Sequence, residues 1–137
     1  MMKSLPPFLL AVALAVALAA CTSTSPFEPR IDTSSMPPDL PRSAIADLDP
    51  EVQKRIERGL TTIQRRLAPV CPPQDIRLMQ EALVLFGWAT TAEVPSPSMQ
   101  AYVDRRAPEL RAARDRLAPA CRAQVDALVT EIRGTAR

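Results

Sequence analysis

Several residue types on which catalysis depends are missing or scarce in this sequence. Its 137 residues include no histidine and no asparagine, and the only lysines are Lys3 and Lys54. Without histidine, imidazole acid/base catalysis and most zinc and iron sites are excluded. Carboxylates are plentiful, but none forms a recognisable catalytic pair. We therefore expect no enzymatic activity, no cofactor or metal site, and no small-molecule substrate.

Aromatic residues are also scarce, at 4% of a chain whose hydrophobic content is 47%. A core built from Ala, Leu, Val and Ile suits closely packed helices, which predicts an all-α fold. The 17 basic and 15 acidic residues alternate along the chain. No basic stripe is evident, so we expect no nucleic-acid binding.

The first 20 residues have the pattern of an export signal. Lys3 precedes an apolar run from Pro6 to Ala20. This run of about 15 residues is shorter than the roughly 20 that a spanning helix needs, which favours a cleaved leader over a transmembrane anchor. Residues 1–20 are therefore predicted to be a signal peptide.

The leader ends in Leu18-Ala19-Ala20-Cys21, which resembles the lipobox of bacterial lipoproteins. The resemblance implies cleavage before Cys21 and lipidation of its sulfur, with palmitate among the acyl chains. An ordinary secreted protein is the alternative. In lipoproteins of Gram-negative bacteria, Asp after the cysteine favours retention in the inner membrane. Thr22 here implies attachment to the periplasmic face of the outer membrane.

Residues 21–48 are rich in proline, serine and threonine and have no sustained apolar period. This composition predicts a flexible, extended, lipidated linker that holds the domain several nanometres from the membrane. The pattern leaves open whether Phe27, Ile31 and Met36 pack onto the domain.

A helical domain is predicted for residues 49–137. Asp49 is a good N-cap, and Pro50 follows in the first helical position. Apolar residues then recur every three or four positions, and prolines at 69, 72 and 73 end the helix. This stripe consists of Val52, Ile56, Leu60, Ile63, Leu67 and Val70.

A second helix is predicted from about Gln74 to Phe86. Apolar residues cover nearly its whole circumference, so it should be buried on most sides. We expect Gly87 to be its C-cap, directly before Trp88. A loop follows, in which Ser96 or Ser98 is positioned to cap the next helix.

The last stretch, residues 99–133, has apolar residues at near-helical intervals but contains Pro108 and Pro119. Each proline removes a backbone donor, so two or three kinked helical pieces are expected. The whole domain is then a small bundle of four helices, or of five.

With Cys21 carrying lipid, two cysteines remain in an oxidising compartment. A Cys71–Cys121 disulfide is the expected pairing, and two buried free thiols are the alternative. A bond that closes a loop of about fifty residues is worth up to about 4 kcal/mol in the chain-entropy model. For so small a core, this contribution would be decisive for the stability of the fold.

The spacing of these features resembles that of type II secretion pilotins of the PulS/OutS kind. The resemblance extends over about residues 52–129 and depends on the run from Cys71 to Ile76, Ala82 in the apolar helix, Gly87-Trp88, Tyr102 and Cys121. It implies an outer-membrane lipoprotein folded as a four-helix bundle with one disulfide. Pilotins of this kind bring secretin subunits to the outer membrane by binding a helix at the secretin C-terminus.

Four large side chains are candidates for the partner-binding surface, namely Phe86, Trp88, Met99 and Tyr102. Aromatic and flexible side chains dominate binding energies, although plain core packing is the alternative role for each. The alternative function is that of a structural or inhibitory periplasmic lipoprotein that binds another envelope protein. An exposed apolar groove would favour the pilotin, and a uniformly polar surface would favour the alternative.

Overall fold

The computed structural model describes residues 30–135, and within this range the chain is all-helical, as predicted. Its five helices confirm the expected small bundle. They are α2 (Arg42–Ala46), α3 (Pro50–Leu67), α4 (Pro73–Thr91), α5 (Pro97–Asp115) and α6 (Pro119–Thr135).

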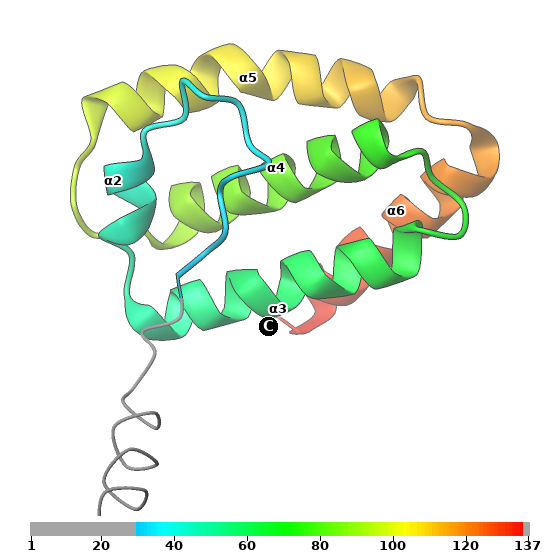
Figure 1. Ribbon diagram of the computed structural model, residues 1–137, viewed down its shortest axis with the longest axis horizontal. Coiled ribbons are helices and arrows are strands. Elements are labelled where there is room, and N and C mark those ends of the chain that lie inside the picture. The colour runs from blue at the N-terminus through cyan, green and yellow to red at the C-terminus, as the bar shows by residue number, and fades with distance from the viewer. Residues whose placement is uncertain (1–29, 136–137) are drawn as a thin grey trace, which may run out of the picture.

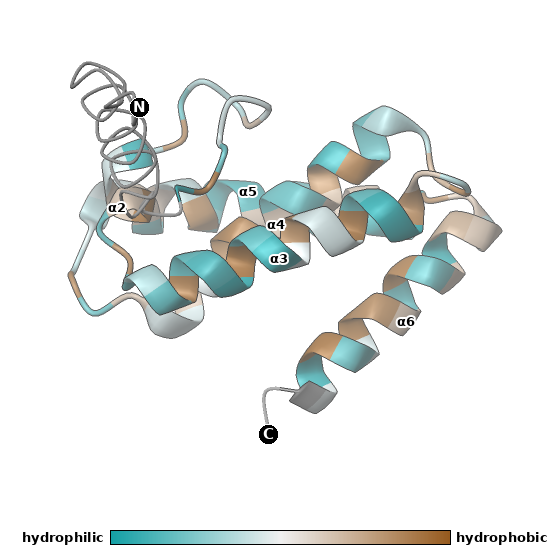
Figure 2. Ribbon diagram, turned by 60° about the horizontal axis from the view of Figure 1, so that its bottom comes forward, coloured by the Kyte–Doolittle hydropathy of each residue, from teal (hydrophilic) through white to brown (hydrophobic). Residues whose placement is uncertain are grey.

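Three long helices, α3, α4 and α5, lie side by side with α4 in the middle (Figure 1). The segment that precedes α3 crosses one face of this layer. Helix α6 lies on the opposite face, beside α3 (Figure 2). The layer is therefore covered differently on its two faces.

Helix α3 begins where the sequence predicts. The Asp49 side chain accepts a hydrogen bond of 2.9 Å from the Glu51 N–H, and Pro50 occupies the first turn. The predicted stripe is buried at Val52, Ile56, Ile63 and Leu67, but Val70 lies beyond the helix end and is exposed.

Helix α4 is longer than predicted, because it continues through Gly87 to Thr91. The expectation that Gly87 ends the helix is wrong. A Cβ atom at Gly87 would lie only 2.5 Å from Cδ1 of Ile56 on α3. Gly87 therefore allows close approach of the two helices. Trp88 lies within α4 and not after its end.

Pro108 and Pro119 have different effects on the last two helices. Helix α5 begins at the cap formed by Ser96, which accepts a hydrogen bond of 3.3 Å from the Met99 N–H, and it continues through the exposed Pro108. Pro119 begins α6 after a short turn. The expected break is thus present before Pro119 and absent at Pro108.

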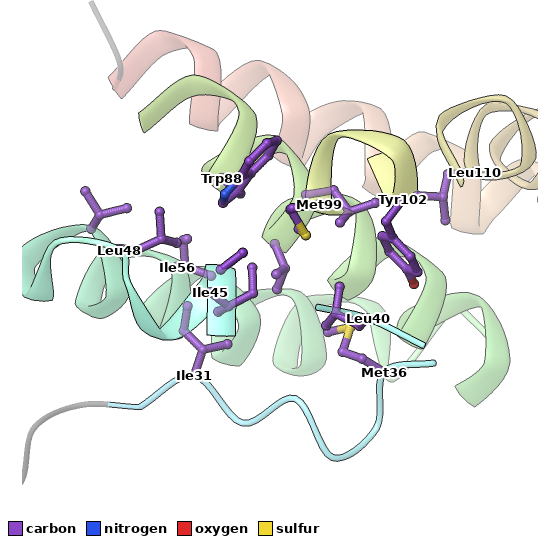
Figure 3. Packing of buried hydrophobic residues seen from close by; sticks show 14 residues of the cluster. Ile31, Met36, Leu40, Ile45, Leu48, Ile56, Trp88, Met99, Tyr102 and Leu110 are labelled. Carbon is purple, nitrogen blue, oxygen red and sulfur yellow. The ribbon is translucent and has the colours of Figure 1, made fainter. Parts of the chain in front are cut away.

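The N-terminal segment, residues 30–48, is not the extended linker that its composition predicts. Turns at Met36 and Leu40, whose N–H groups donate to the carbonyls of Thr33 and Pro37, fold it against the helices. Its apolar side chains meet those of α3, α4 and α5 in one cluster (Figure 3). The buried residues of the segment are Ile31, Met36, Leu40, Ala44, Ile45 and Leu48. Phe27 and residues 21–29 lie outside the described part of the chain.

The core consists of two clusters. The first joins the N-terminal segment to α3, α4 and α5, and the second surrounds Cys71 and Cys121 at the other end of α3 and α4. Because α6 contributes only to the second cluster, it leaves part of the layer uncovered.

Candidate functional site

An apolar groove lies on the face of the layer that carries α6, with a volume of about 450 Å³. Helix α4 forms its floor, and the walls come from α5 on one side and from α3 and α6 on the other. Most of its lining residues are aliphatic. The lining residues are Ile63, Leu67, Met79, Ala82, Leu83, Leu85, Phe86, Ala89, Val103, Ala107, Leu110, Val125, Leu128, Val129 and Ile132, together with three arginines.

The groove exists because α6 packs along α3 and not along α5. Arg66 of α3 donates two hydrogen bonds to the carboxylate of Glu131 on α6, at 2.9 and 3.1 Å. At the end of the groove closer to the turn between α5 and α6, Arg114 of α5 donates a hydrogen bond of 2.6 Å to Asp126 of α6. The hydrogen bond to Asp126 raises the pKa of Arg114, and the carboxylate balances the charge of the guanidinium. From there α5 and α6 diverge (Figure 2).

The confirmed Cys71–Cys121 disulfide holds the start of α6. It joins the turn after α3 to the first turn of α6, across a sequence separation of 50 residues. Cys121 is fully buried and Cys71 nearly so. The position of the α6 wall therefore depends on this covalent bond as well as on packing against α3.

Phe86 is the one predicted partner-binding residue that lines the groove. Its side chain is 53% exposed, which is unusual for a phenylalanine because apolar burial is favourable. Phe86 lies on the floor of the groove, between Ala82 and Ala89. An aromatic ring in this position can provide a large contact area for an apolar partner.

The other three predicted binding residues are buried in the first cluster. Trp88 is 6% exposed, Met99 is inaccessible and Tyr102 is 2% exposed. They point into the interior between α4, α5 and the N-terminal segment (Figure 3). The expectation that they share a surface with Phe86 is wrong, because the N-terminal segment covers them.

A buried charged group that the sequence analysis missed lies on α4. Glu81 accepts hydrogen bonds from Arg106 at 2.7 and 2.8 Å and from the Tyr102 hydroxyl at 3.0 Å. Burial and the bond to Glu81 raise the pKa of Tyr102, and the bond to Glu81 raises that of Arg106. These bonds join α4 to α5 and use the hydrogen-bonding capacity of Glu81, so the group has a structural role.

Neither a membrane-crossing helix nor a metal site is found in the part of the chain that the structure describes. No helix among residues 30–135 is both long and apolar enough to cross a bilayer. In the same range, no three His, Cys, Asp or Glu residues are grouped so that they could hold a metal ion. Cys21, the predicted lipidation site, lies outside the described residues.

Comparisons of the chain with protein-family models, with curated proteins and with solved structures found no match.

Proposed function

We propose that this protein is an outer-membrane lipoprotein that binds a helical segment at the C-terminus of a secretin and targets it to the outer membrane, as type II secretion pilotins do. The observation that carries the proposal is the apolar groove with the exposed Phe86 on its floor. Amphipathic helices bind in apolar grooves of this kind through residues three and four positions apart.

The dimensions of the groove fit about three turns of helix. On its floor, Met79 and Ala89 are ten residues apart, which corresponds to about 15 Å at 1.5 Å per residue. A partner that is disordered when free loses about 2–5 kcal/mol in ordering, so most of its apolar face must be buried to offset this. A floor and two walls supply contact on three sides, which makes micromolar affinity reasonable.

The tether also supports action near a membrane. If Cys21 carries the lipid, Arg30, where the described chain begins, lies nine positions further along the chain. A chain of this length extends at most about 30 Å. Replacing Cys21 with Ala should abolish incorporation of labelled palmitate, and unchanged labelling would end the lipoprotein part of the proposal.

The apolar groove favours this function over that of a structural or inhibitory lipoprotein, for which a uniformly polar surface is expected. The full chain, extracted in a non-ionic detergent, should bind a peptide that spans the C-terminal segment of a secretin from the same organism. Phe86→Ala should weaken this binding by about 2 kcal/mol if the ring is a main contact.

Val94→Ala is a matched control, because Val94 is 57% exposed and lies outside the groove. Circular dichroism should show unchanged helicity for both variants. Equal binding by the wild type and Phe86→Ala would reject the groove as the binding site, and no binding by any form would reject the function.

A further inference from the structure

We infer that the helix which binds this groove carries acidic residues along both edges of its apolar face. This inference rests on the proposed function, and it specifies the chemistry of the partner. The observation behind it is that every charged residue lining the groove is an arginine, namely Arg111, Arg114 and Arg133.

The chain as a whole has no such bias, since its 17 basic and 15 acidic residues nearly balance. The groove departs from this balance, because no Asp or Glu among residues 30–135 lines it. Arg114 is compensated by Asp126. Within the same residues, no ion pair includes Arg111 or Arg133. Two exposed positive charges at the groove are therefore left for a partner.

These two arginines belong to opposite walls. Arg111 is on α5, one turn before Arg114, and Arg133 is near the C-terminal end of α6. A helix that lies on α4 between the walls has one flank toward each arginine. Carboxylates on both flanks would pair with them, whereas lysines or arginines there would be repelled.

The apolar contacts and the charges have different effects. Burial on the floor supplies most of the affinity, and it does not distinguish one amphipathic helix from another. Charges at the rim select the partner, set its orientation and speed its association. The arginines would thus favour acidic amphipathic helices over basic ones.

Two synthetic helices test the inference. Both carry the same leucine stripe over about three turns, with glutamate at the flanking positions in one and lysine in the other. Binding is measured by fluorescence anisotropy of the labelled peptides with the full chain in non-ionic detergent, and detergent alone is the blank. At low salt the glutamate peptide should bind about tenfold more tightly, and the difference should shrink at about 0.5 M salt.

Charge-reversal variants identify the arginines responsible. Arg111→Glu combined with Arg133→Glu should reverse the preference, so that the lysine peptide binds more tightly. Both side chains are exposed, so the fold should be preserved. Arg55→Glu combined with Arg58→Glu on α3 changes the net charge equally at exposed positions outside the groove, and it should leave the preference unchanged.

The possible results separate the inference from the proposed function. Equal binding of both peptides, with loss of both in Phe86→Asp, would overturn the acidic partner and leave a helix-binding groove. Binding of neither peptide would overturn the function and the inference together. A concentration-dependent dimer that Phe86→Asp dissociates would assign the groove to a second copy of the chain and also overturn the inference.

Discussion

Gly87 of α4 lies directly against Ile56 of α3, so that a Cβ atom on the glycine would be 2.5 Å from Cδ1 and 2.9 Å from Cγ1 of the isoleucine. Ile56 is 4% exposed and β-branched, so its side chain has little freedom to move away. The same two helices meet again at Gly59 of α3 and Leu83 of α4, where the corresponding distance is 2.6 Å. Two glycines therefore allow the close approach of α3 and α4.

Gly87→Ala should lower the free energy of unfolding by about 1–2 kcal/mol. Overpacking costs about 1–3 kcal/mol and exceeds the gain in helix propensity of up to about 1 kcal/mol. Urea unfolding followed by fluorescence of Trp88, which is the one tryptophan and is buried, measures the change. Gly134→Ala is the control, because no atom lies within 4 Å of its Cβ position. Equal stability of Gly87→Ala and the wild type would contradict the close packing.

Removing the disulfide by Cys71→Ala with Cys121→Ala should lower the free energy of unfolding by about 2–4 kcal/mol, since a loop of 50 residues is released. The wall formed by α6 should also loosen, so peptide binding should weaken. Urea unfolding and peptide titration measure the two effects. Dithiothreitol should weaken binding by the wild type and leave the double variant unaffected. Unchanged binding after reduction would show that packing against α3 alone holds α6.

Glu81→Ala should destabilise the fold by about 2–3 kcal/mol, because it leaves the Arg106 guanidinium and the Tyr102 hydroxyl without their buried partner. The estimate is at the low end for a buried pair, since Glu109 also bonds Arg106. Glu109→Ala is the matched control. It removes the exposed partner of the same arginine and should cost less than about 1 kcal/mol. Similar losses in the two variants would contradict a buried ion pair at Glu81.

Leu40→Ala in the N-terminal segment should lower the free energy of unfolding by about 2 kcal/mol or more, because Leu40 is 4% exposed within the first cluster. An exposed residue of the same segment, Ser35, provides the control Ser35→Ala, for which a change below about 0.5 kcal/mol is expected. Urea unfolding of both variants measures the two changes in stability. An unchanged midpoint for Leu40→Ala would mean that the segment is a free linker after all.

Local signals in the sequence predict where α3 and α5 begin, but not α2 or the end of α4. Asp49-Pro50 marks the start of α3, and Ser96 caps α5, because capping depends on a few neighbouring residues. The number of cysteines, together with the predicted export, is enough to predict the disulfide. The role of Gly87 is not evident from the sequence, because a glycine that ends a helix and a glycine that lets two helices touch look alike in sequence.

The candidate site was harder to predict, because it depends on which helix faces which. Phe86 and Trp88 are two residues apart on α4 and therefore point in different directions, one into the groove and one into the core. The apolar residues of the N-terminal segment are too widely spaced for a helical or strand pattern, so the sequence does not predict their packing. The groove itself follows from the tertiary placement of α6, for which no local motif exists.

Delivery of secretin to the outer membrane is tested by fractionation of cells that lack the gene, with blotting for secretin multimers in the outer membrane. The deletion should reduce these multimers severely. Wild-type protein and Val94→Asp should restore them, whereas Phe86→Asp should not, because it places a charge on the apolar floor of the groove. Normal amounts of secretin multimer in the outer membrane of the deletion strain would contradict the account.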